Sequence, residues 1–126
     1  MSNHSKGSIL VIEDNPDNMK LVIWMLEDEG YTTASAFNAV VGLQLAASNT
    51  YDAILLDISL PGMNGKEATI KLRATEKYQH APIFALTAHA TIKEKNEILD
   101  SGVDELITKP INEALLLERL KHHIQS

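Results

Sequence analysis

The sequence predicts an α/β fold in which five helices pack on both faces of a doubly wound, five-stranded parallel sheet. Five short apolar runs alternate with five longer amphipathic stretches along the 126 residues. Strict alternation of strands and helices is typical of a parallel sheet with right-handed crossovers. The run at residues 53–56 is continuously apolar, as expected for a strand covered on both faces. A chain of this length fits one compact domain with its own core.

The first part of the chain predicts two strands and two helices. Residues 8–12 form a short apolar run typical of a strand, and Pro16 suits the first turn of the helix that follows. Gly30 ends that helix, in which apolar residues recur at helical spacing, namely Met19, Val22, Ile23 and Leu26. Residues 31–36 predict the second strand. Residues 39–48 predict the second helix, which has on one side Val40, Leu43 and Ala47.

The second part of the chain continues the alternation. The remaining strands are expected at residues 52–57, 82–86 and 104–107, the fourth of the five ending at Thr87. The helices between them are expected from the end of the loop at 58–65 to about Ala74 and at 93–101, before Gly102. Asn112 is expected to cap the last helix, with three residues facing inward, namely Leu115, Leu116 and Leu120.

Composition narrows the classes of protein to which this chain can belong. It has no cysteine, so neither a disulfide framework nor a cysteine-based zinc site is possible. It shows no signal peptide and no apolar run of the roughly 18 to 20 residues that a membrane helix needs, so we expect a cytoplasmic location and no membrane partner. The net charge of −6 argues against a nucleic-acid partner. We expect a flexible segment at residues 1–7 and one domain at 8–126.

Polar side chains are expected where four of the strands end. Glu13 and Asp14 follow the first strand, Asp57 ends the third, Thr87 ends the fourth, and Lys109 follows the fifth. Ligands of an open parallel sheet bind beyond these carboxyl ends, so the side chains should converge there. Crowded carboxylates repel one another and raise each other's pKa unless a cation neutralises them. Mg²⁺, or Mn²⁺ in its place, is the cation that suits such oxygen ligands.

Each of these residues also has an ordinary structural explanation. Asp14 suits the positive end of a helix dipole, and Asp57 suits a turn. Thr87 would serve as a helix cap and Lys109 as a solvated side chain. Their joint position at one edge of the sheet favours a functional site, because unneutralised carboxylates would repel one another there.

Phosphoryl transfer is the chemistry that this set of residues predicts. A carboxylate such as Asp57 can act as a nucleophile and form an aspartyl phosphate. The cation and Lys109 would offset the repulsion between the two anions. Thr87 would then donate a hydrogen bond to an oxygen of the attached phosphoryl group.

Four motifs stand in order along the chain, namely Glu13-Asp14, Asp57 within LLDISLPGMNG, Thr87-Ala88 and Lys109-Pro110. On these motifs, residues 8–124 resemble the receiver domains of two-component response regulators, among them the single-domain chemotaxis and cell-cycle receivers. The resemblance implies the flavodoxin-like strand order 2-1-3-4-5. It implies a signalling switch, not an enzyme, which catalyses only its own phosphorylation and dephosphorylation. Its partners would be a histidine kinase or histidine phosphotransfer protein and an unknown downstream protein.

The resemblance also implies a role for each site residue. The cation would be held by Glu13 (largely through water), Asp14, Asp57 and the backbone carbonyl of Ser59. Asp57 would be the phosphoacceptor, Thr87 the switch hydroxyl, and Lys109 the partner of the phosphoryl group. A cis bond from Lys109 to Pro110 would aim the lysine into the site. The output face would comprise the fourth helix, the fifth strand and the fifth helix, with the candidate contacts Lys93, Glu94, Glu97, Glu105 and Glu113.

Three positions qualify this resemblance. Leu106 stands where many receivers have Tyr or Phe, so we expect the phosphorylation chemistry but no aromatic readout. Ser59 and His89 stand two residues beyond Asp57 and Thr87, at positions that flank the phosphoryl group in the family and tune its lifetime. A solvated loop histidine is the alternative for His89.

Other functions fit the sequence less well. An aspartate-nucleophile phosphatase needs a second aspartate where this chain has Ser59. An FMN-binding flavodoxin needs a phosphate loop rich in Ser, Thr and Gly, where this chain has the acidic run at residues 13–15. Two alternatives stay open, namely a receiver-fold scaffold that binds partners without phosphorylation and a receiver domain taken from a hybrid kinase.

Overall fold

A five-stranded parallel sheet in the order β2-β1-β3-β4-β5 forms the centre of the computed structural model, which describes residues 6–60, 62–88 and 91–124. The strands are β1 (Ser8–Ile12), β2 (Thr32–Ala36), β3 (Ala53–Asp57), β4 (Ile83–Thr87) and β5 (Glu105–Thr108). The helices are α1 (Pro16–Glu29), α2 (Ala39–Ser48), α3 (Gly65–Arg73), α4 (Ile92–Asp100) and α5 (Glu113–Ile124), with a short 3₁₀ helix, η1 (Glu76–Tyr78). The predicted fold class and strand order are confirmed.

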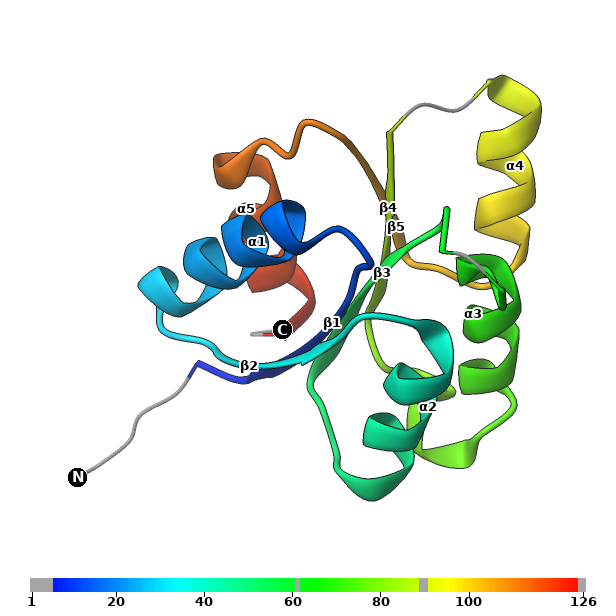
Figure 1. Cartoon of the computed structure of the whole chain (residues 1–126), viewed down its shortest axis with the longest axis horizontal. Coiled ribbons are helices and arrows are strands. Elements are labelled where there is room, and N and C mark those ends of the chain that lie inside the picture. Colours follow the sequence, from blue (N-terminus) through cyan, green and yellow to red (C-terminus); the bar gives the residue numbers. More distant parts are fainter. Residues whose placement is uncertain (1–5, 61, 89–90, 125–126) are drawn as a thin grey trace.

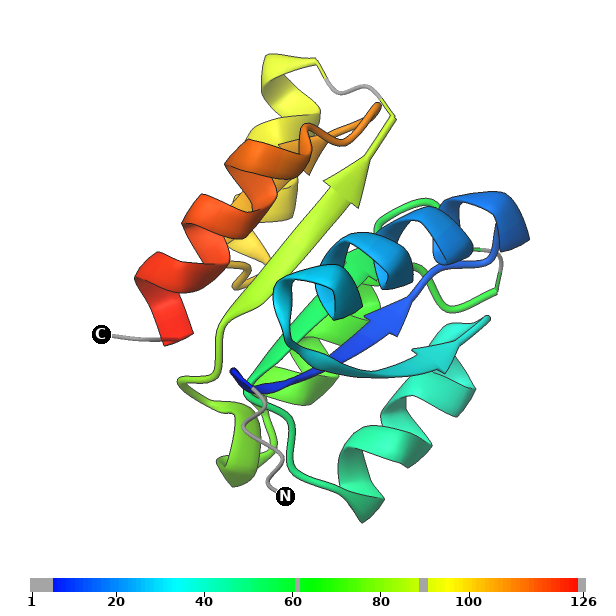
Figure 2. The same cartoon turned by 90° about the vertical axis from the view of Figure 1, so that its left-hand side faces the viewer.

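The helices form two layers, one on each face of the sheet. Helices α1 and α5 cover one face, and α2, α3 and α4 cover the other (Figure 1). The strand arrows point the same way in the turned view, as expected for parallel pairing (Figure 2). All five carboxyl ends therefore lie at one edge of the sheet, which is where a ligand site is expected.

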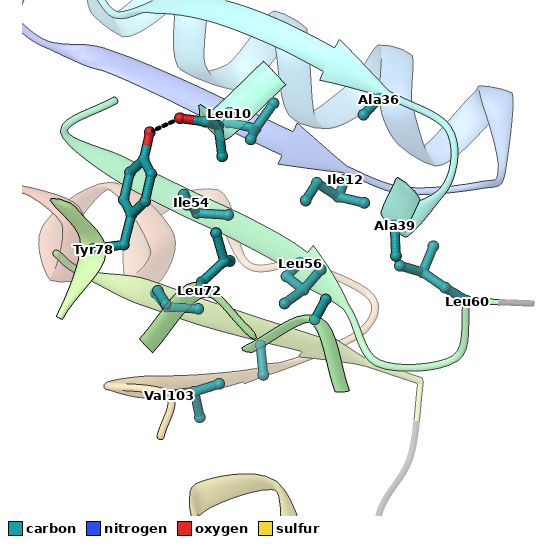
Figure 3. Packing of buried hydrophobic residues seen from close by; sticks show 14 of the residues in the cluster. Leu10, Ile12, Ala36, Ala39, Ile54, Leu56, Leu60, Leu72, Tyr78 and Val103 are labelled. Carbon is teal, nitrogen blue, oxygen red and sulfur yellow. Dashed lines mark hydrogen bonds between the residues drawn. The ribbon is translucent and has the colours of Figure 1, made fainter. Parts of the chain in front are cut away.

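An apolar core lies between each face of the sheet and the helices that cover it, because alternate side chains of each strand point to opposite faces. Leu10, Ile12, Ile54 and Leu56 belong to the core under α2, α3 and α4 (Figure 3). Ile9, Val11, Leu55 and Phe84 belong to the core under α1 and α5. Every residue of β3 and β4 is buried, which explains the continuous apolar run in the sequence.

Polar side chains mark where the helices begin. Asn15 accepts hydrogen bonds from two amides of the first turn of α1, and Asn38 accepts one from α2. Capping boxes at Asn64 and Thr91 start α3 and α4. The predicted cap Asn112 is confirmed, because its Oδ1 atom accepts a hydrogen bond of 3.0 Å from the Leu115 amide.

One prediction about a helix face needs correction. Leu115 does not face inward, since 47% of its surface is exposed, whereas Leu116 and Leu120 are fully buried. One residue turns a helix by about 100°, and α5 packs on the sheet so that Leu116 is buried and Leu115 lies to the side. The buried side of α2 is formed by the small residues Ala39, Gly42 and Ala46, and on the apolar side noted in the sequence Leu43 packs against the core whereas Val40 is 53% exposed.

The start of the described chain is tied to the turn that follows α1. The Lys6 amide donates to the Gly30 carbonyl at 3.0 Å, and the Thr32 amide donates to the Gly7 carbonyl at 2.9 Å. Residues 1–5 lie outside the described ranges, so the boundary at residue 8 stays a prediction. None of the helices in these ranges has the length and apolar composition needed to cross a bilayer.

Candidate functional site

Three carboxylates meet at the carboxyl edge of the sheet. Glu13 and Asp14 follow β1, Asp57 ends β3, and one oxygen of each lies within 4.8 Å of the others. Glu13 is fully buried and Asp57 is 3% exposed, whereas Asp14 is exposed to solvent. The structure therefore brings together the three acidic side chains that the sequence predicts.

Lys109 reaches this cluster from the loop after β5. Its Nζ atom lies 2.9 Å from Glu13 Oε1 and 3.1 Å from Asp57 Oδ2, and only 17% of the lysine side chain is exposed. The Lys109 amide donates to the Thr87 carbonyl at 2.7 Å, which joins the loops after β4 and β5. The peptide bond from Lys109 to Pro110 is cis, as predicted.

Backbone amides hold the remaining carboxylate oxygens. The Ser59 amide donates to Asp57 Oδ1 at 2.9 Å, and the Asn15 amide donates to Glu13 Oε2 at 3.2 Å. Gly65, the first residue of α3, lies so close to the acceptor that a Cβ atom there would be 2.6 Å from the Asp57 carbonyl oxygen. Glycine therefore allows α3 to begin directly against the end of β3.

Burial and hydrogen bonding shift the ionisation of these groups in different directions. Burial raises the pKa of Glu13 above its ordinary value, and the hydrogen bond from Lys109 offsets this only in part. Burial also acts to raise the pKa of Asp57, but its hydrogen bonds, first of all from the Ser59 amide, hold that pKa below its ordinary value. Burial acts to lower the pKa of Lys109, but its bonds to Glu13 and Asp57 raise it. Of the two buried carboxyls, Asp57 is thus the one whose pKa the site lowers.

The donor set suits a divalent cation. With all three carboxyls ionised, the carboxylates and the Lys109 ammonium together carry a net charge of −2, which one divalent cation neutralises. Oxygen ligands from carboxylates and a carbonyl are those that Mg²⁺ prefers. Glu13, Asp14 and Asp57 therefore fit a magnesium site, and the role of the Ser59 carbonyl stays a prediction.

A cavity of about 180 Å³ opens beside Asp57, between the ends of β3 and β4 and the facing sides of α3 and α4. It is lined by Ile58, Ser59, Lys66, Thr87, Ala88, Glu94, Glu97 and Ile98. Thr87, which ends β4 as predicted, is 4% exposed. Lys66 is not among the site residues predicted from the sequence, because it lies at no strand end and in none of the four motifs.

Several residues predicted to contact a partner on the output face make contacts within the protein itself. Glu94 belongs to the capping box of α4, and Glu105 Oε2 accepts hydrogen bonds from Arg119 and pairs with His123. Leu106 is half-buried and packs against the core under α2, α3 and α4. His89, the predicted tuning position, lies outside the described residues.

Known proteins resemble this chain along almost its whole length. The family model described as the response regulator receiver domain matches residues 9–121. The chain is 37% identical over 113 residues to the sensor histidine kinase GacS of Pseudomonas protegens, covering 87% of this chain and only 12% of that kinase. It is 35% identical over 117 residues to the polar-differentiation response regulator DivK of Brucella anthropi, covering 93% of this chain and 95% of that protein.

Solved structures show the same arrangement of strands and helices. One is the receiver domain of a Pseudomonas aeruginosa sensor histidine kinase with a magnesium ion coordinated in its active-site cleft, with a TM-score of 0.89 and 35% identity over 95% of this chain and 98% of that one. Another is the chemotaxis protein CheY4 of Vibrio cholerae, with a TM-score of 0.87 and 28% identity over 92% of this chain and 97% of that one.

Proposed function

The chain belongs to the response regulator receiver domain family, and we propose from this premise that it accepts a phosphoryl group on Asp57 in a Mg²⁺-dependent reaction and thereby changes its binding to a protein partner. The observation that carries the proposal is the environment of the Asp57 carboxylate. One oxygen accepts the Ser59 amide at 2.9 Å, and the other lies 3.1 Å from Lys109 Nζ. Two further carboxylates beside it, Glu13 and Asp14, supply oxygen ligands that suit a divalent cation. The family is a signalling module, and this chain would catalyse only its own modification.

The proposed donor is a phosphohistidine on a histidine kinase or a histidine phosphotransfer protein. An oxygen of Asp57 attacks the phosphorus, the P–N bond breaks, and its electron pair returns to the imidazole nitrogen. Lys109 keeps its ammonium against the anionic oxygens, and the Thr87 hydroxyl donates to a phosphoryl oxygen. Glu13, Asp14, Asp57 and the Ser59 carbonyl would hold Mg²⁺, which would supply the positive charge that lets the two anions approach. Hydrolysis later releases inorganic phosphate and restores the carboxylate.

The proposed output is a change on the face formed by α4, β5 and α5. A new phosphoryl anion recruits Thr87 and Lys109, which pulls the loops after β4 and β5 inward. A switch between two populations needs a preference of about 3 to 5 kcal/mol. Two charge-assisted hydrogen bonds of roughly 1.5 to 3 kcal/mol each supply much of it.

The proposal also covers whether this receiver domain stands alone or belongs to a larger protein. The chain spans nearly all of DivK but only 12% of GacS, so a single-domain regulator and one domain of a larger sensor kinase are both represented among its relatives. We favour a single-domain regulator in the cytoplasm. Its partners would be proteins, without nucleic acid or membrane.

Mass spectrometry of the intact protein tests this function. The protein is incubated with Mg²⁺ and acetyl phosphate, beside Asp57→Asn, a sample without metal, and the control Asp28→Asn, which changes an exposed carboxylate on α1. We expect one phosphoryl adduct in the wild type and in the control, and none without metal or in Asp57→Asn. An adduct that survives the loss of Asp57 would refute the assignment. No adduct at all would favour the scaffold that binds partners unmodified.

A further inference from the structure

An ion pair joins α3 and α4 across the mouth of the cavity beside Asp57. Lys66 is the second residue of α3, and its Nζ atom lies 3.6 Å from Oε1 of Glu97 on α4. The two side chains are 36% and 48% exposed. A pair this long and this exposed is screened by water and salt, so it holds the lysine only weakly.

The Lys66 side chain also lines that cavity together with Ser59 and Thr87. Ser59 follows the acceptor by two residues and binds its Oδ1 atom, and Thr87 lies one residue beyond the cross-strand partner of Asp57, Leu86. The cavity begins at Ile58 and Ser59, directly after Asp57, and the Ser59 amide binds Asp57 Oδ1 whereas Lys109 contacts Oδ2. Lys66 therefore borders the space that the group would enter.

The charges around the cavity favour a change in the ion-pair partner of Lys66 after phosphorylation. Its two carboxylates are Glu94 and Glu97, and Glu94 Oε1 already accepts the Thr91 amide at 3.0 Å in the capping box. The carboxylate that pairs with Lys66 is Glu97. A phosphoryl group carries a charge of about −1.5 to −2 and three strong acceptor oxygens, so it competes well against one exposed carboxylate.

We propose that Lys66 is a second cation of the phosphoryl site, which pairs with Glu97 before phosphorylation and with a phosphoryl oxygen afterwards. This inference rests on the proposed function. The exchange breaks the link between α3 and α4, so phosphorylation reaches α4 by a route that needs no aromatic side chain at Leu106. Lys66 stabilises the attached phosphoryl group, and Glu97 competes against it.

Binding of beryllofluoride, a stable mimic of the phosphoryl group, tests this exchange. Its dissociation constant is measured at saturating Mg²⁺ for the wild type, Lys66→Met, Glu97→Gln and the double variant. The matched control is Lys71→Met, on the same helix but lining a different cavity. We expect about tenfold weaker binding in Lys66→Met, because one charge-assisted contact is lost. We expect severalfold tighter binding in Glu97→Gln and no change in the control.

The direction of the two effects separates this inference from a purely structural role. If the pair merely braced α3 against α4, both variants would break it and would shift the affinity the same way. The exchange requires opposite shifts, and it requires that Glu97→Gln has no effect once Lys66 is replaced. Equal affinity of the wild type and Lys66→Met would overturn it.

Two controls keep this test distinct from the proposed function. Failure of the wild type to bind beryllofluoride, or to form an adduct with acetyl phosphate, would count against phosphorylation itself. Mg²⁺ affinity without beryllofluoride and the thermal midpoint Tm report on the metal site and the fold. We expect both to be nearly unchanged in Lys66→Met, and a large loss of either would count against a specific phosphoryl contact.

Discussion

Glu13 and Asp57 are adjacent buried carboxyls whose pKa values shift in opposite directions. Both are desolvated, which acts to raise each pKa. Each accepts hydrogen bonds from one backbone amide and from Lys109, but only at Asp57 do the hydrogen bonds outweigh burial, so the pKa of Asp57 is lowered and that of Glu13 is raised. The proposed phosphoacceptor is therefore the carboxyl whose pKa its surroundings lower.

Glu105 provides a test of electrostatic stabilisation away from the site. Hydrogen bonds from Arg119, opposed by burial, lower the pKa of Glu105 below its ordinary value of 4.5, and His123 adds to the effect. A carboxyl whose pKa is lower in the folded state stabilises the protein at pH values above its unfolded-state pKa. This stabilisation is lost as the pH falls through the folded-state pKa. We expect Glu105→Gln to lower the Tm by about 3 °C at pH 7. The difference from the wild type should shrink below pH 4.5.

The comparison for this variant is Glu118→Gln. Glu118 lies 3.8 Å from Arg119, but 63% of its side chain is exposed, so its removal should change the Tm little. Thermal unfolding at a series of pH values measures both variants. A difference for Glu105→Gln that stays constant with pH would show that packing, not ionisation, carries its effect.

The end of α2 shows how one element completes another. The last carbonyls of a helix lack partners within it. The Tyr78 hydroxyl, from η1, lies 2.8 Å from both the Ala46 and the Asn49 carbonyl oxygens. A dashed line in Figure 3 starts from this hydroxyl. The Lys77 ammonium also reaches the Asn49 carbonyl at 2.8 Å. This short helix therefore caps α2 from a distant part of the chain.

Tyr78→Phe tests this contact between elements. The variant keeps the ring, which is 1% exposed, and removes the hydroxyl from the two carbonyls. We expect a loss of about 1 to 3 kcal/mol in the free energy of unfolding, because a buried polar contact is left incomplete. Urea denaturation measures it, with Tyr51→Phe as the control in the same core. Equal losses in both variants would argue against a capping role.

The whole molecule is acidic, and part of that charge is concentrated at the proposed metal site. The net charge is −6, and three carboxylates share one corner of the sheet. Their mutual repulsion disfavours the folded state, in which they are close, more than the unfolded chain. A cation that binds only the folded state removes this repulsion and links metal concentration to stability.

Addition of Mg²⁺ should therefore raise the Tm of the whole protein. At ten times its dissociation constant, a ligand of the folded state contributes about 1.4 kcal/mol, which corresponds to several degrees. Calorimetry with Mg²⁺, against sodium chloride of equal ionic strength, measures the shift. Asp14→Asn should raise the metal-free Tm, since it removes one negative charge, and should reduce the Mg²⁺ shift. Equal Mg²⁺ shifts in both proteins would exclude Asp14 as a ligand.

The order of elements and the edge that carries the site follow from the sequence. Alternating strand and helix patterns admit few topologies, because parallel strands need right-handed crossovers. The carboxyl end of each strand can then be located, and the structure finds Glu13, Asp57 and Lys109 at one edge. These predictions succeed because each depends on local periodicity and on a general rule of sheet geometry.

Contacts between elements that are distant in sequence could be identified only from the tertiary structure. Leu115 and Leu116 are both apolar, and only the packing of α5 on the sheet exposes one and buries the other. The pairing of Lys66 with Glu97, and their position over the cavity next to Thr87, depend on how α3 and α4 lie against each other. No periodic pattern in the sequence reveals such contacts, because they depend on how segments that are far apart in sequence pack in three dimensions.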